Sequence, residues 1–96
     1  MSRHAVFRFQ LFVAGDAPNS AHAIANLGAF CGANLKDRYE IEVVDVFREP
    51  KRALAEGIFM TPTLVVLTPP PHRRIVGTLA QTETLLRALG LVPLPT

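Results

Sequence analysis

Thr61-Pro62-Thr63-Leu64 is the stretch of this chain that says most about its fold. It opens an apolar run from Thr63 to Thr68, which is short and rich in β-branched residues and therefore predicts a buried strand. Pro69-Pro70-Pro71 follows at once, and three successive residues without an N–H donor cannot continue a hydrogen-bonded ladder. The strand is therefore predicted to start beside Pro62 and to end in a turn at the triple proline.

The N-terminal part of the chain predicts a strand followed by a long helix. Residues 6–13 alternate between apolar and polar side chains, as a strand with one well-buried face does. Pro18 suits the first position of a helix, where its missing N–H costs little, and Asp16 or Ala17 is expected near the cap. Helix capping is also the interpretation of the polar side chains of Asp16 and Ser20. The helix is expected over residues 18–34, with a buried stripe of Ala21, Ile24, Leu27, Cys31 and Leu35.

The middle and the second half of the chain predict two more strands around a short helix. Residues 41–46 are rich in β-branched side chains and predict a strand. Pro50 opens a short helix that runs through about Glu56, and Gly57 ends it. After the triple proline, residues 73–76 predict the last strand, which pairs back across the turn.

The C-terminal part predicts a last helix over residues 80–89, which Gly90 ends as a residue that tolerates the left-handed conformation. The resulting order is βαβαββα, an α/β fold with a mixed four-stranded sheet and flanking helices. We expect a single domain over residues 1–96, with residues 91–96 as a flexible tail.

The composition fits one compact domain and argues against several classes of function. Of the 96 residues, 49% are hydrophobic, which is too many for a disordered chain. The net charge of +2 comes from ten basic and eight acidic residues, a balance too even to predict nucleic-acid binding. No apolar run reaches the roughly 18 residues of a membrane helix, and no signal peptide is recognisable, so we expect no membrane association and a cytoplasmic location. Cys31 is the one cysteine, which precludes an internal disulfide.

Pro62 and the start of the first helix together resemble the active-site region of thioredoxin-like enzymes. In that class a Thr-Pro or Ile-Pro dipeptide opens a strand with the proline in cis, facing a Cys-x-x-Cys at the helix start. Here Ala17 and Ser20 occupy the positions of the two cysteines. Disulfide exchange needs one thiolate to attack and a second thiol to resolve the mixed disulfide. The resemblance implies a thioredoxin-like fold with a cis Pro62, and it leaves a thioredoxin-class redox enzyme as an unfavoured alternative.

The sequence predicts no catalytic, cofactor or metal site of another kind. Asp16 and Ser20 lack the Gly-x-Ser-x-Gly context of a nucleophilic serine. Gly15 lacks the further glycines and the lysine of a phosphate-binding loop. The histidines show no metal-ligand spacing. We therefore expect a binding protein rather than an enzyme.

Four groups of residues carry a more specific resemblance. They are Leu11-Phe12-Val13-Ala14-Gly15 with Pro18-Asn19-Ser20, Val43-Val44-Asp45-Val46 with Pro50, Thr61-Pro62-Thr63-Leu64, and Pro69-Pro70-Pro71-His72-Arg73-Arg74-Ile75-Val76-Gly77. In this order and at this spacing they resemble the KaiB family of the bacterial circadian oscillator. The resemblance implies a non-enzymatic protein that binds the hexameric RecA-like ATPase KaiC, sequesters KaiA and competes with the KaiB-like domain of the histidine kinase SasA.

The KaiB family is also known for two folds that differ in the second half of the chain. One is a tetrameric ground state, and the other is a thioredoxin-like monomer that binds KaiC; two such packings must lie within a few kcal/mol of each other. The family commonly has Gly at the position of Ala88 and Asp at that of Gly90. Ala is favoured in a helix interior and Gly just past its end, so both differences predict the thioredoxin-like fold. The KaiB ground-state fold, as a tetramer or dimer, is the alternative.

The resemblance places the partner-binding surface on the short second helix and its flanks. The residues expected to contact a partner are Arg48, Lys51, Arg52, Leu54, Ala55, Glu56, Gly57 and Arg74. This stretch is basic at its start and has fewer acidic and amide residues than the oscillator proteins. A different RecA-like ATPase, a receiver-like partner or a KaiC with an altered charge pattern would also fit. The main alternative function is a stand-alone sensor or adaptor module for a histidine kinase.

Overall fold

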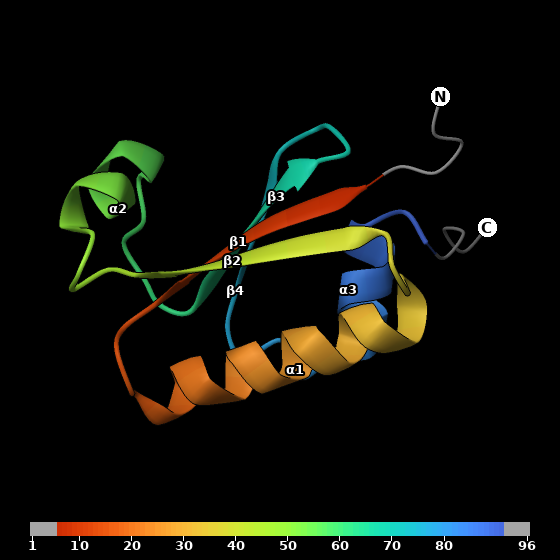
Figure 1. Cartoon of the computed structure of the whole chain (residues 1–96), viewed down its shortest axis with the longest axis horizontal. Helices are drawn as coiled ribbons and strands as arrows, with labels where there is room; N and C mark the ends of the chain where they lie inside the picture. Colours follow the sequence, from red (N-terminus) through yellow and green to blue (C-terminus); the bar gives the residue numbers. More distant parts are fainter. Residues whose placement is uncertain (1–5, 92–96) are drawn as a thin grey trace.

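The computed structural model of the chain describes residues 6–91 (Figure 1). Within these residues the elements follow in the order β1 (Phe7–Val13), α1 (Pro18–Asn34), β2 (Tyr39–Asp45), α2 (Pro50–Glu56), β3 (Thr63–Thr68), β4 (Arg73–Val76) and α3 (Thr82–Ala88). The predicted βαβαββα order is confirmed. None of the helices in this part of the chain is long and apolar enough to cross a membrane.

The strands form one mixed sheet in the order β2-β1-β3-β4. β1 and β2 are parallel, which requires a crossover connection, and α1 provides it. β3 is antiparallel to both β1 and β4. Because β1 and β2 run the same way, the loops that follow them lie at the same end of the sheet, together with α2 and the start of α1 (Figure 1).

One face of the sheet carries α1 and α3 and holds the larger hydrophobic core. Figure 1 shows both helices on the same side of the strands. The buried residues of this core are Phe7, Phe9, Leu11, Val13, Ala23, Leu27, Phe30, Cys31, Leu35, Leu64, Val66, Leu79, Leu85 and Leu89. Burial of apolar surface is the dominant favourable contribution to folding, so this face contributes most of the stability of the domain.

The opposite face is covered only in part, by α2. Its buried core consists of Phe12, Val44, Ala53 and Val65. Away from α2 this face is polar, with Arg8 and Glu40 paired at 3.5 Å between neighbouring strands. The sheet therefore has one fully packed face and one that α2 covers at a single end.

The buried stripe of α1 differs from the predicted one. The buried residues of the helix are Ser20, Ala23, Leu27, Phe30 and Cys31. Ala21 and Ile24, which we expected inside, are exposed. The two stripes share Leu27 and Cys31 and both have helical spacing, so the period alone does not say which side of the helix meets the sheet.

Of the two residues expected near the cap of α1, Ala17 is the N-cap residue, which confirms that alternative. No side chain makes a capping hydrogen bond there, so the capping interpretation of Asp16 and Ser20 is wrong. The Ser20 hydroxyl oxygen instead accepts the backbone N–H of Ala14 at 3.0 Å and is buried. Ser20 therefore ties the end of β1 to α1 rather than capping the helix.

The last helix begins two residues later than predicted, at Thr82. Leu79, which is buried in the main core, has a φ of 63°, so the chain is still turning there and cannot be helical. Nearby, Asn26 of α1 donates a side-chain hydrogen bond of 2.8 Å to the carbonyl oxygen of Thr78. These contacts fix the loop between β4 and α3 against the core.

α3 ends at a left-handed glycine, as the sequence predicts. Gly90 has a φ of 72°, and its N–H bonds the Arg87 carbonyl oxygen at 3.1 Å. The N–H of Leu91 bonds the Leu86 carbonyl oxygen at 2.8 Å, which completes a Schellman motif. Leu91 packs against the main core, and residues 92–96 of the expected tail lie outside the described residues.

Candidate protein-binding site

α2 is a short helix that presents most of its side chains to solvent. Pro50 stands at its first turn, and Gly57, with a φ of 71°, ends it. The Gly57 N–H bonds the Leu54 carbonyl oxygen at 3.0 Å and the Ile58 N–H bonds that of Ala53 at 2.9 Å, a second Schellman motif. Ala53 is the one buried residue of the helix, and Leu54 is 75% exposed. α2 therefore offers an apolar side chain to solvent that no residue of the described chain covers.

The loop between α2 and β3 adds two larger apolar side chains. Phe59 is 91% exposed and Met60 is 62% exposed. The loop is tied at its base, because the Thr63 hydroxyl donates to the Met60 carbonyl oxygen at 2.5 Å. The Thr61–Pro62 peptide bond is cis, as predicted, and Pro62 is buried. Phe59 and Met60 thus precede β3, which starts at Thr63. Exposed aromatic and methionine side chains are typical of protein-binding surfaces.

A shallow pocket of about 170 Å³ lies beside this loop. Its lining residues are Gly57, Ile58, Phe59, Met60, Thr63, Arg74 and Val76. The pocket is mainly apolar, and Arg74 is the one charged residue in its wall. It is smaller than the roughly 300–1,000 Å³ of most small-molecule sites, so it suits a single side chain of a partner better than a ligand of that class.

The basic residues at the start of α2 do not all have free charges. Arg52 donates to both carboxylate oxygens of Glu42 at 2.7 Å and to Glu49 at 3.2 Å. The Arg52 hydrogen bonds hold the pKa of the Glu42 carboxyl below its ordinary value, and Glu42 and Glu49 in turn raise the pKa of Arg52. Arg48 and Lys51 are exposed and form no ion pair with another described residue. The available positive charge of this surface therefore lies on Arg48 and Lys51.

Arg74 binds the end of α2. It donates to the Gly57 carbonyl oxygen at 3.1 Å, to the Glu56 carbonyl oxygen, and to the Glu56 carboxylate at 3.1 Å. A helix leaves its last carbonyl groups without partners, and a cation there is favourable. Arg74 on β4 thus holds the C-terminal end of α2, including Glu56 and Gly57, against the sheet. Ala55 lies exposed on the helix.

The region that resembles a thioredoxin active site contains no reactive thiol. Ala17 is the N-cap of α1, and Ser20 is buried and bonded to the Ala14 N–H. Cys31 is buried in the main core, and desolvation raises the pKa of its thiol to about 11. A thiol with this pKa is almost wholly protonated at neutral pH and is a poor nucleophile. In the part of the chain that the structure describes, no group of three His, Cys, Asp or Glu residues is placed to hold a metal ion.

The sequence analysis missed Phe59 and Met60, the most prominent apolar side chains of this surface. They stand between Gly57, which ends a helix, and Pro62, which opens a strand, so they belong to a connecting loop. Two large apolar residues in a short loop are the signal that could have identified them, since such residues are usually buried. Phe47, 74% exposed in the loop before α2, carries the same signal.

Comparison with families and curated proteins supports one assignment. A family model described as the KaiB domain matches residues 10–91. The circadian clock protein KaiB3 of Synechocystis is 42% identical over 84 residues, which cover 88% of this chain and 82% of that protein. The circadian clock oscillator protein KaiB of Prochlorococcus marinus is 38% identical over 92 residues, which cover 96% of this chain and 79% of that protein.

Comparison with solved structures confirms the thioredoxin-like fold. The N-terminal domain of SasA from Synechococcus elongatus superposes with a TM-score of 0.75 at 22% identity, covering 93% of this chain and 84% of that domain. Mitochondrial thioredoxin 3 from Saccharomyces cerevisiae superposes with a TM-score of 0.71 at 16% identity, covering 93% of this chain and 81% of the thioredoxin. At these identities the likeness describes the fold.

Proposed function

This chain belongs to the KaiB family, and from that premise we propose that it is a non-catalytic regulator of a clock or clock-like signalling system that binds a KaiC-type, RecA-like ATPase. The observation that carries the proposal is the surface formed by α2 and the loop that follows it. Leu54, Phe59 and Met60 are exposed there beside two unpaired cations, Arg48 and Lys51. We call these five residues the α2 surface.

The α2 surface has the chemistry of a protein interface. Phe59, the most exposed large apolar residue of the described chain, would supply the aromatic anchor on which binding energy usually concentrates. Arg48 and Lys51 would steer a partner with a complementary acidic patch and so increase the association rate. The fixed positions of the helix end and of the strand that starts at Thr63 reduce the ordering cost of binding.

The fold of the chain supports the same proposal. In the KaiB family the thioredoxin-like monomer is the state that binds KaiC, and this structure has that fold, with a helix at Thr82–Ala88. We propose that the binding state is a monomer and that the family's tetrameric ground state is the less stable packing for this sequence. A KaiA-like protein and a histidine kinase with a KaiB-like domain are further partners that the family membership suggests.

The proposal is tested by measuring the affinity of the chain for the KaiC-type ATPase of the same cell. Phe59→Ala removes the aromatic anchor and is expected to weaken binding at least about tenfold. The double reversal Arg48→Glu with Lys51→Glu is expected to lower the association rate and to reduce its dependence on salt. The matched control, Lys36→Glu with Arg38→Glu, makes the same change in net charge beyond the C-terminal end of α1, far from α2 in Figure 1.

Equal affinities for the wild type and both α2-surface variants would exclude this surface as the binding site. If the ATPase binds none of these proteins, the KaiC-type partner itself is wrong, and the adaptor function for a histidine kinase takes its place. A comparable loss in the Lys36 and Arg38 control would show that net charge, rather than this surface, decides binding.

A further inference from the structure

β4 is an outer strand of the sheet, and none of residues 6–91 pairs with its outer edge. The sheet order places it beside β3 alone. The register pairs Leu64 with Ile75, and the Gly77 N–H bonds the Pro62 carbonyl oxygen at 3.0 Å. Backbone groups in antiparallel strands alternate between the two sides, so the N–H and C=O groups of Arg74 and Val76 point away from β3. This edge therefore offers backbone donors and acceptors to an added strand.

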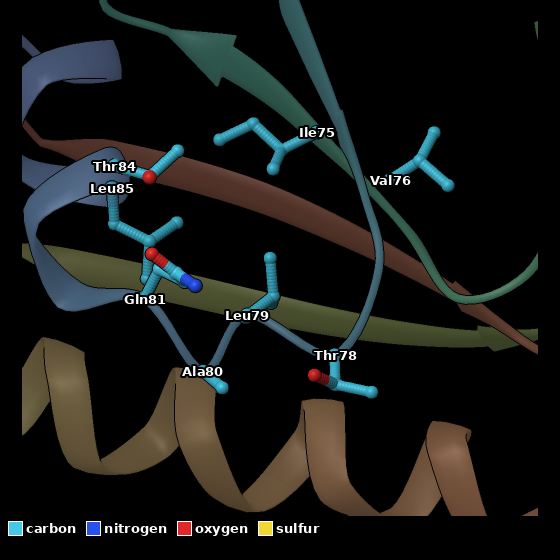
Figure 2. A pocket seen from close by; sticks show the side chains of 8 residues that line it. All are labelled: Ile75, Val76, Thr78, Leu79, Ala80, Gln81, Thr84 and Leu85. Carbon is cyan, nitrogen blue, oxygen red and sulfur yellow. The ribbon is translucent and has the colours of Figure 1, made fainter.

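The two faces of the sheet each have a pocket at this edge. The pocket described above lies on the α2 face. A second pocket, of about 210 Å³, lies on the α3 face (Figure 2). Its lining residues are Ile75, Val76, Thr78, Leu79, Ala80, Gln81, Thr84 and Leu85. Figure 2 shows Ile75 and Val76 on opposite sides of the β4 ribbon, with Ile75 directed toward Leu79 and Leu85.

Val76 borders both pockets, and it is 53% exposed. Successive side chains of a strand point to opposite faces of the sheet. A strand added beside β4 would therefore place one side chain in the pocket on the α2 face and its neighbour in the pocket on the α3 face. Backbone pairing combined with pockets for alternate side chains is the geometry by which β-strand addition recognises peptides.

The charge at this edge selects the kind of segment. Arg73 and Arg74 stand next to each other on β4, and neither pocket has a carboxylate in its wall. Arg74 is paired with Glu56. Arg73 donates only to the carbonyl oxygens of Pro71 and Pro69, at 3.1 and 3.5 Å, and forms no ion pair among the described residues. Its positive charge is available to a carboxylate.

We propose that the free edge of β4 is a docking site for an extended segment of a partner protein that carries apolar residues followed by acidic ones. In antiparallel pairing, an apolar side chain opposite Val76 enters the pocket on the α2 face. The next apolar side chain, opposite Ile75, enters the pocket on the α3 face. The two acidic residues that follow lie opposite Arg74 and Arg73. This site shares Phe59 and Met60 with the α2 surface, because both residues line the pocket on the α2 face. It does not require the proposed binding of an ATPase, since its backbone pairing uses the edge of the sheet.

A second copy of this chain is a poorer occupant of the edge. Antiparallel pairing of β4 with β4 about Ile75 would set Arg74 of each copy opposite Val76 of the other, so neither arginine of β4 would meet a carboxylate across the new strand pair. Pairing of β4 with the opposite edge strand, β2, would join copies head to tail without closure. The carboxylates of β2 also have partners already, Glu40 with Arg8 and Glu42 with Arg52.

The test is a nitrogen-15 NMR titration of the full chain with a capped pentapeptide of sequence threonine-leucine-valine-glutamate-glutamate. The largest amide shifts are expected at Arg74 and Val76, with smaller shifts at Phe59, Thr78 and Leu79. A peptide with two lysines in place of the glutamates is expected to bind with a Kd that is at least about tenfold higher.

A pair of variants separates this edge from the other one. Val76→Asp is expected to raise the Kd at least about tenfold, because it places a carboxylate beside the incoming acidic segment. Val43→Asp, the same change at an exposed position of the opposite edge strand β2, is expected to leave the Kd unchanged. If Val76→Asp does not fold, the comparison of the two peptides on the wild type still decides.

Four results would overturn the proposal. Shifts confined to β2 would mean that the peptide uses the other edge. Equal binding of the glutamate and lysine peptides would mean that Arg73 and Arg74 do not select an acidic segment. No shifts at millimolar peptide would mean that these arginines only protect the strand from pairing. The same shifts on raising the concentration of the chain without peptide would assign the edge to a second copy.

Discussion

The two faces of the sheet differ in how their helices are held. Fourteen buried residues form the core under α1 and α3, whereas four form the core under α2. α2 is held instead by polar contacts, from Arg74 to its last carbonyl groups and from Arg52 to Glu42. A helix that buries only Ala53 and pairs Arg52 and Glu56 still leaves Lys51 and Leu54 exposed to a partner. The packed face therefore stabilises the domain, and the α2 face is the one suited to binding.

The largest effect is expected from a cavity in the packed face. Leu27 of α1 is fully buried, so Leu27→Ala should lower the free energy of unfolding by about 2–5 kcal/mol. Leu54→Ala on α2 removes the same atoms from an exposed side chain, and it should change the free energy of unfolding by less than about 0.5 kcal/mol. Urea unfolding of both variants measures the difference. Equal losses would mean that α2 is packed as tightly as α1.

An intermediate effect is expected at the C-terminal end of the packed face. The double substitution Ala88→Gly with Gly90→Asp weakens α3 and its left-handed end. It should reduce the free-energy difference between this fold and the KaiB ground-state fold by about 1–2 kcal/mol. Backbone NMR of the wild type should show one set of signals with a helix over residues 82–88. The double variant should show a second, slowly exchanging set. A strand signature near Ala88 in the wild-type protein would contradict the account of these two positions.

A smaller and more local effect is expected where β4 holds α2. Arg74→Leu removes the hydrogen bonds to Glu56 and Gly57 and should lower the free energy of unfolding by about 0.5–1.5 kcal/mol. The effect is small because these contacts are exposed to solvent. Amide hydrogen exchange should become faster in α2 and stay unchanged in α1. Arg73→Leu is the matched control, because the side chain of Arg73 donates its hydrogen bonds to Pro71 and Pro69 rather than to α2. Unchanged exchange in α2 after loss of Arg74 would show that the small core alone holds the helix.

The smallest effect at neutral pH concerns Cys31. Burial raises the pKa of its thiol from an ordinary value of 9.0 to about 11, so the folded state favours the neutral thiol. The contribution of this pKa difference to the free energy of unfolding is fully present below pH 9 and is lost as the pH rises toward 11. Cys31→Ser should remove this part of the pH dependence. The wild type should also not accelerate the reduction of insulin beyond the rate with dithiothreitol alone. An acceleration that Cys31→Ser abolishes would contradict the assignment of this thiol to the core.

Much of this fold follows from local sequence signals. The triple proline, the left-handed Gly57 and Gly90, and the β-branched run of β3 mark where elements end, because each has a direct conformational effect. The sequence alone could not show that α1 buries Phe30 rather than Ile24. This choice depends on how the helix is rotated on the sheet, which is a tertiary property.

The candidate site could be predicted from the sequence only in part. The sequence predicts the position of α2 and places Leu54 on its binding surface, but it does not show which of the cations of α2 form ion pairs. Arg52 is paired because Glu42, on a neighbouring strand, reaches it. Likewise, the sequence does not show that Arg74 binds the end of α2, because the contact joins residues that are 18 positions apart. Contacts between distant elements decide which charges a partner can use.

The most direct test of the contrast between the two faces is amide hydrogen exchange of the chain alone and with a saturating KaiC-type ATPase. The account predicts new protection in α2 and in the loop that carries Phe59 and Met60, with α1 unchanged. Protection confined to the exposed side of α1, with α2 exchanging as it does in the free chain, would contradict it.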